Sequence, residues 1–198
     1  MSLTITNECN MDLMARYSDN YFDLAIVDPP YKEDISGLKV GFSRDFNYDT
    51  FKAPTKDYIS ELFRVSKNQI LWGFNYYLEL LPNTDNVICW FKHQNGHFSE
   101  CEYAWCSIKK SRLFDRPYQK DQYNKIHPTQ KPVALYKWLL DNYAKQGDKI
   151  LDTHLGSMSI AIACADYGFD LVGCELDVDY YNKGLERVKN HTNQTKLF

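Results

Sequence analysis

Short apolar runs alternate along this chain with longer segments whose apolar residues recur at helical spacing. The run from Phe22 to Val27 is typical of a buried strand, whereas Thr55 to Val65 and Pro132 to Ala144 have helical periodicity. Such alternation is typical of a mostly parallel sheet covered by helices on both faces. The sequence therefore predicts a three-layer α/β domain with a mostly parallel sheet. Strands are expected at 3–6, 22–27, 69–74, 87–91, 101–108, 149–152 and 170–175, and helices at 11–17, 55–65, 132–144, 159–167 and 179–190.

The bulk properties favour one domain spanning residues 1–198, with a long loop over about 32–53 that we expect to be mobile. A net charge of −3 means that any surface for nucleic acid must be a local patch. The six cysteines include no Cys-x-x-Cys pair, and no apolar run is long enough to span a bilayer. We therefore expect a cytoplasmic protein without a membrane partner. His93 and His97 lack a third ligand, so no metal site is predicted.

The sequence Asp28-Pro29-Pro30-Tyr31 follows directly after the strand predicted at 22–27. Proline fixes φ and donates no backbone hydrogen bond, so nearby carbonyls remain free as acceptors. A carboxylate with bare carbonyls suits an amino group, and a tyrosine ring suits stacking on a flat heterocycle. These residues are therefore suited to binding the exocyclic amine of a nucleobase. A stiff turn without chemistry is the alternative.

A second strand ends at Asp152 and leads through a small-residue loop with Gly156 and Ser157 into a helix. About twenty residues later another strand ends at Glu175. A loop that lets backbone amides approach a ligand, followed by a carboxylate that binds ribose hydroxyls, is typical of nucleotide sites in doubly wound folds. A plain strand–helix–strand unit is the alternative. A third segment, residues 127–132 (HPTQKP), frames polar side chains with two prolines and leads into a helix.

Together these motifs resemble the β-group of DNA amino-methyltransferases, which use S-adenosylmethionine to methylate adenine N6 or cytosine N4. The order supports the resemblance, because the Asp-Pro-Pro-Tyr motif precedes the cofactor loop, with the HPTQKP hexapeptide between them. The likeness covers nearly the whole chain and is strongest to short, phage-associated adenine methylases. It implies a Rossmann-like methyltransferase fold with a permuted motif order.

The resemblance also implies roles for particular residues. Asp28 and the Pro29 carbonyl would accept hydrogen bonds from the target amine, beside Pro30, and Tyr31 would stack on a base flipped out of the duplex. The amine would then attack the methyl group directly, without a covalent enzyme intermediate. The implied S-adenosylmethionine-binding residues are Thr129, Gln130, Lys131, Asp152, His154, Gly156, Ser157, Glu175, Leu176 and Asp177. Met158 stands where relatives commonly have glycine, which would reshape the loop or weaken cofactor binding.

Residues 109–126 form a short basic segment with interleaved aromatic residues, which suits contact with double-stranded DNA. Its predicted DNA contacts are Lys109, Lys110, Arg112 and Arg116, although a solvated surface loop is the alternative for any one of them. This segment offers few residues that could read the edges of bases. We therefore expect a short or relaxed recognition sequence, or recognition shared across a homodimer. Adenine N6 is the favoured target because a serine in place of Asp28 would favour cytosine N4. The remaining alternatives are cytosine N4 and a catalytically impaired nucleic-acid-binding or nucleotide-binding relic.

Overall fold

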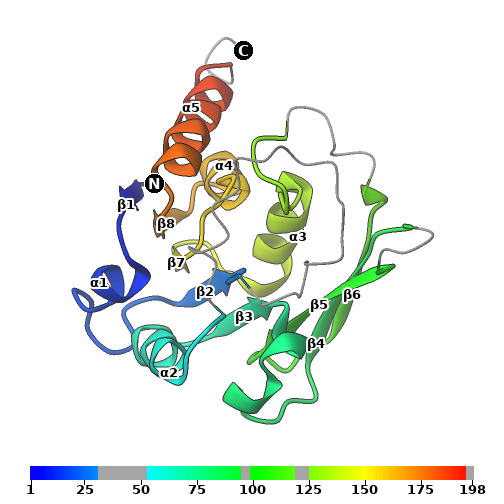
Figure 1. The fold of residues 1–198 in the computed structure, drawn as a ribbon. Coiled ribbons are helices and arrows are strands. Elements are labelled where there is room, and N and C mark those ends of the chain that lie inside the picture. The colour runs from blue at the N-terminus through cyan, green and yellow to red at the C-terminus, as the bar shows by residue number, and fades with distance from the viewer. Residues whose placement is uncertain (31–52, 95–98, 119–124, 195–198) are drawn as a thin grey trace.

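A single sheet with helices on both faces organises the chain (Figure 1). The computed structural model describes residues 1–30, 53–94, 99–118 and 125–194. Tyr31, nearly all of the loop predicted over 32–53, and residues 119–124 of the basic segment lie outside the described residues.

The strands pair in the order β1-β8-β7-β2-β3-β5-β4-β6. They comprise β1 (Leu3–Asn7), β2 (Leu24–Val27), β3 (Gln69–Trp72), β4 (Val87–Phe91), β5 (Cys101–Cys106), β6 (Arg112–Asp115), β7 (Lys149–Asp152) and β8 (Asp170–Glu175). Every pairing is parallel except those of β5, which runs antiparallel to both β3 and β4. The predicted mostly parallel sheet is confirmed.

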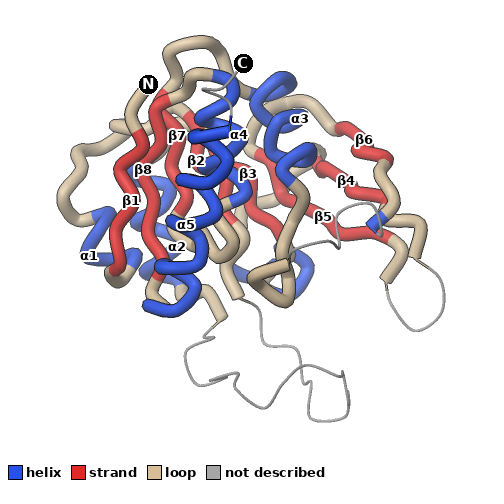
Figure 2. The backbone as a smooth tube through the Cα atoms, turned by 90° about the horizontal axis from the view of Figure 1, so that it is seen from above, coloured by secondary structure: helices blue, strands red, loops and turns tan. Residues whose placement is uncertain are grey.

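The helices form the two outer layers, which Figure 2 shows from above. The helices are α1 (Asn10–Met14), α2 (Lys56–Val65), α3 (Val133–Tyr143), α4 (Ser159–Tyr167) and α5 (Val178–Gln194), with short 3-10 turns η3 (Phe74–Tyr76) and η4 (Leu78–Leu80) after β3. The apolar residues of α1 and α2 pack in one core cluster, and those of α3, α4 and α5 pack in the other. The predicted three-layer arrangement is confirmed.

The central strands supply both clusters because successive side chains of a strand point to opposite faces. In β2, Leu24 and Ile26 pack with the α3–α4–α5 layer, whereas Ala25 and Val27 pack with α1 and α2. All four side chains are buried, which explains why the sequence of this strand is a continuous apolar run.

Several elements differ from the sequence prediction. β2 begins at Leu24 instead of Phe22, β3 and β5 each end two residues early, and α5 runs on to Gln194. The first helix ends at Met14 instead of Tyr17, and Arg112–Asp115 forms an edge strand within the segment predicted to be a basic loop. Phe114 is the buried residue of that strand and packs against Trp138 of α3, while the whole strand pairs with β4. Within the described ranges, no helix combines the length and apolar character needed to cross a membrane.

Candidate active site

Three carboxylates lie along one edge of the sheet because three neighbouring parallel strands end there. Glu175 ends β8, Asp152 ends β7 and Asp28 follows β2, and these strands are adjacent in the order β8-β7-β2. The chain order is different, since β2 precedes the other two by more than a hundred residues. Parallel pairing therefore brings the two halves of the predicted site together at the carboxyl ends of the strands, where ligands bind in open α/β sheets. We call this the carboxyl edge.

Asp28 is held by one strong contact and offers a second oxygen. Its Oδ2 lies 2.5 Å from the Lys131 ammonium, which comes from the hexapeptide before α3. Among the described residues, Oδ1 is buried and has no hydrogen-bond partner. Burial raises the pKa of Asp28 above its usual value, and Lys131 opposes that rise. The carboxylate is therefore a fixed acceptor with one oxygen left for a donor.

The hexapeptide places Lys131 against Asp28, and its own side chains stabilise the loop that it forms. The Ile126 amide donates to Gln130 Oε1 at 3.2 Å, so the Gln130 side chain stabilises the loop from within. Thr129 is exposed, and its hydroxyl lies 3.2 Å from His127 Nδ1. Of the three residues expected to contact the cofactor here, Lys131 is the one that the structure joins to Asp28.

The loop after β7 places its predicted residues in different directions. Asp152 is buried, accepts a hydrogen bond from the His154 amide at 2.9 Å, and has its pKa raised to about 8, mainly by burial. The His154 ring lies 3.1 Å from the Asn10 amide nitrogen and edge-on to Tyr58, so it packs toward α1 and α2. Gly156 has a φ of +48°, a left-handed conformation that glycine adopts without strain.

Glu175 braces this loop from the neighbouring strand. One carboxylate oxygen accepts from the Gly156 amide at 2.7 Å and the other from the Asp177 amide at 2.9 Å. The Asp177 carboxylate in turn caps α5 by accepting from the Asp179 and Tyr180 amides. Leu176 is exposed between these two carboxylates. The carboxyl edge therefore groups Glu175, Gly156 and Leu176. The Asp177 carboxylate is occupied by its hydrogen bonds to the first turn of α5.

Ser157 and Met158 complete the loop and anchor it to α5. Arg187 donates to the Ser157 carbonyl at 2.6 Å and to the Ser159 hydroxyl at 3.0 Å. Met158 has a φ of +57°, so it keeps the left-handed conformation expected of glycine at this position. Its side chain is buried beside Gly184, where an added Cβ would lie 2.7 Å from Met158 Cγ.

The basic segment is split between the two edges of the sheet, and the predicted DNA contacts are divided with it. Lys109 and Lys110 follow β5, and Arg112 begins β6. Because β5 is antiparallel to β3 while β6 is parallel to β4, these three residues lie at the edge opposite Asp28. Lys110 has a structural contact, since its ammonium donates to the Asn142 carbonyl at 2.8 Å in the last turn of α3. Arg116 follows β6 and lies at the carboxyl edge.

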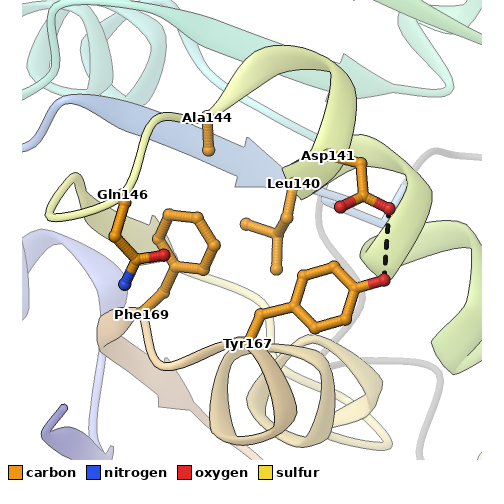
Figure 3. A pocket seen from close by; sticks show the side chains of 6 residues that line it. All are labelled: Leu140, Asp141, Ala144, Gln146, Tyr167 and Phe169. Atoms are coloured by element: carbon orange, nitrogen blue, oxygen red, sulfur yellow. Dashed lines mark hydrogen bonds between the residues drawn. The ribbon is translucent and has the colours of Figure 1, made fainter.

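A hollow at the far edge is separate from this site (Figure 3). It lies where α3 and α4 end and is lined by Leu140, Asp141, Ala144, Gln146, Tyr167 and Phe169. Figure 3 shows the Tyr167 hydroxyl donating to Asp141, at 3.1 Å. No residue of the predicted site lines it. Among the described residues, no cluster of His, Cys, Asp or Glu side chains suits a metal ion.

Two site residues were not identified from the sequence. The His127 ring lies between Gly156 and Tyr180, 4.4 Å from the tyrosine ring, and burial lowers its pKa to about 4. Because His127 is the first residue of the hexapeptide, its position could have marked it as a site residue. Glu102 of β5 lies 3.1 Å from the Lys131 ammonium. No local motif marks Glu102, because Lys131 belongs to a separate segment of the chain.

Comparisons with known proteins agree with the geometry. A family model described as DNA methylase matches residues 79–186. Type II methyltransferase M.HpaI of Haemophilus parainfluenzae is 23% identical, over 88% of this chain and 70% of its own length. DNA adenine methyltransferase YhdJ of Escherichia coli K12 is 35% identical over a shorter stretch, 36% of this chain and 24% of its own length.

Solved structures share the fold across almost the entire chain. The M1.HpyAVI–SAM complex superposes with a TM-score of 0.66 at 16% identity, covering 93% of this chain and 99% of that one. The PvuII DNA methyltransferase, described as cytosine-N4-specific, gives a TM-score of 0.66 at 9% identity, covering 98% and 92%. These likenesses establish the fold.

Proposed function

This chain belongs to the N6/N4 family of DNA methylases, and we propose that it transfers a methyl group from S-adenosylmethionine to the N6 amine of adenine in DNA. The observation that carries the proposal is the Asp28 carboxylate, with Oδ2 fixed by Lys131 and Oδ1 buried without a partner among the described residues. A buried acceptor left unsatisfied costs free energy, on the order of 1–3 kcal/mol. An incoming amine would remove that cost by donating to Oδ1.

The chemistry follows from the nature of an exocyclic amine, which is a poor nucleophile because its lone pair is delocalised into the ring. Hydrogen bonds from the amine to Asp28 and to the Pro29 carbonyl would favour a pyramidal nitrogen and localise the lone pair. The amine would then attack the methyl carbon in line as the carbon–sulfur bond breaks, and the methylated nitrogen would release one proton. Catalysis of this kind depends on positioning and electrostatics. The base must leave the duplex to reach Asp28.

The residues of the carboxyl edge fit S-adenosylmethionine, the cofactor of the family. Asp152 is buried, and no ion pair joins it to a cation among the described residues, so it suits a positively charged ligand. Glu175 keeps acceptor capacity on both oxygens after its two backbone contacts and suits ribose hydroxyls. The exposed side chains of Leu176 and Val178 offer an apolar surface for an adenine ring. S-adenosylmethionine supplies an electrophilic methyl group on a sulfonium.

Transfer of radiolabelled methyl groups to unmethylated double-stranded DNA, followed by nucleoside analysis, tests this proposal. N6-methyladenine is the expected product. N4-methylcytosine would contradict the adenine assignment, and absence of transfer despite cofactor binding would contradict the activity.

The first prediction concerns Asp28→Asn, which keeps the shape but replaces one acceptor oxygen with a donor. We expect transfer to fall at least about 100-fold, as when a single preorganised group is lost from an active site. Cofactor affinity, measured by calorimetry, should stay within about threefold of wild type, because Asp152 and Glu175, the carboxylates proposed to hold the cofactor, lie at the ends of β7 and β8 and do not contact Asp28 through a hydrogen bond. Retained transfer in this variant would remove Asp28 from its role.

A further inference from the structure

Four charged side chains of alternating sign form a row at the carboxyl edge. The Lys92 ammonium lies 3.0 Å from Glu102 Oε1, and the Lys131 ammonium lies 3.1 Å from Glu102 Oε2 and 2.5 Å from Asp28 Oδ2. The charges sum to zero. Lys131 is almost wholly buried, with its ammonium 5.4 Å from the centre of the Trp72 ring. We call these four residues the charge row.

We propose that Glu102 is a positioning residue for methyl transfer, holding the Lys131 ammonium so that it engages one oxygen of Asp28 and leaves the other for the target amine. The inference rests on the proposed function and extends it to a residue on β5. Glu102 reaches the site because β5 is antiparallel and therefore begins at the carboxyl edge.

The geometry explains why a second carboxylate matters. An ammonium has three donors and no fixed plane, so a lysine that met Asp28 alone would be free to move across both carboxylate oxygens. Glu102 draws the ammonium from the other side and fixes its position between two carboxylates. Lys92 then balances the charge of Glu102, which would otherwise be costly to bury.

The electrostatics of the surrounding groups agree with this arrangement. Burial raises the pKa of Glu102, but Lys131 and Lys92 outweigh it, so the pKa lies below its usual value and Glu102 is ionised at neutral pH. Its charge raises the pKa of Asp28, opposing Lys131. Among the described residues, other titratable groups that interact with the charge row include Asp152 from β7, Tyr136 from α3 and His127 from the hexapeptide.

The second prediction concerns Glu102→Gln, which removes the charge and keeps the size. The titration midpoint of Asp28 should move to lower pH, because a neighbouring negative charge is lost. Lys131→Met should move it to higher pH, because the neighbouring positive charge is lost. Carbon-13 NMR of the aspartate carboxyls in the free protein measures both shifts, with Asp28→Asn assigning the resonance. Opposite shifts support the proposal, and an unchanged midpoint in Glu102→Gln overturns it.

Kinetics provide the second readout. In Glu102→Gln, we expect kcat to fall about 10- to 100-fold, because small misplacements of reacting groups cost this much, while cofactor affinity is kept. Glu61→Gln is the matched control, since Glu61 pairs with Arg64 on α2, and it should leave both readouts unchanged. A wild-type kcat in Glu102→Gln overturns the proposal.

Two further points keep the test decisive. If Glu102→Gln does not fold, Glu102→Asp retains the charge with a shorter reach. This variant should lower kcat, and a wild-type kcat would overturn the positioning role. The NMR titration needs no substrate, so wild-type protein that transfers no methyl group refutes the proposed function without refuting the coupling of Glu102 to Asp28.

Discussion

Asp152 shows how a single residue of this site opposes stability. It is almost completely buried, and its pKa is raised to about 8, chiefly by burial, whereas an unfolded aspartate titrates near 3.8. Between these two values the folded state binds a proton that the unfolded state has released. The free energy of unfolding due to this group therefore falls as pH rises from about 4 to about 8. A carboxylate retained at such a cost is a candidate for function.

The third prediction follows for Asp152→Asn. Asparagine cannot ionise, and its amide oxygen can still accept from the His154 amide. The free variant should therefore be more stable than wild type at pH 8, by on the order of 2 kcal/mol or about 4–8 °C in Tm. The difference should shrink toward pH 4. Thermal denaturation across this range measures it, and a gain that does not depend on pH would contradict the assigned cause.

At the scale of elements, the contact between Met158 and Gly184 joins the cofactor loop to α5. The residue in the left-handed position is a methionine, and a glycine on the facing helix leaves room for its side chain. The sequence predicted that Met158 would reshape the loop or weaken binding. The structure pairs Met158 with a compensating glycine and keeps the left-handed backbone, while the effect on cofactor binding stays a prediction.

The fourth prediction concerns Gly184→Ala, whose effect on the free energy of unfolding should change sign when Met158 is replaced as well. Gly184→Ala alone should lower the free energy of unfolding by about 1–3 kcal/mol, because its Cβ overlaps the buried Met158. In a Met158→Ala background the same change should raise stability by up to about 1 kcal/mol, because alanine favours helix over glycine. Urea denaturation of the four proteins measures the coupling. Additive effects would show that the two residues do not share this space.

The elements also show how far the sequence could predict the site. Asp28, Asp152 and Glu175 each follow an apolar run, and parallel strands end at a common edge, so the grouping of all three was predictable. The antiparallel direction of β5 was not predictable, because an apolar run carries no record of which way it pairs. That direction puts Lys109 and Lys110 at the far edge and Glu102 at the near one. The Lys131–Asp28 contact spans 103 residues, and no local pattern encodes it.

At the scale of the whole molecule, the proposed role of Asp28 requires that DNA approach the carboxyl edge, so that the target amine can reach this carboxylate. The net charge of −3 gives no general attraction for DNA, so cations at that edge matter individually. Arg116 lies there, in a segment fixed to β4 through its amide and the Phe91 carbonyl at 3.1 Å. Arg112 is the first residue of β6 and Arg116 follows its last, so Arg112 lies at the opposite edge, about 13 Å away at the usual rise per residue.

The fifth prediction compares these two arginines as a matched pair of equal charge at the two ends of β6. If Arg116 contacts a phosphate, Arg116→Gln should weaken DNA binding about tenfold and reduce the slope of log K against log salt by about one. Arg112→Gln should leave both quantities near wild type, because its edge faces away from the site. Fluorescence anisotropy with a labelled duplex at several salt concentrations measures both variants. Equal losses would show that the far edge also binds DNA, and that the duplex reaches beyond the carboxyl edge of the sheet.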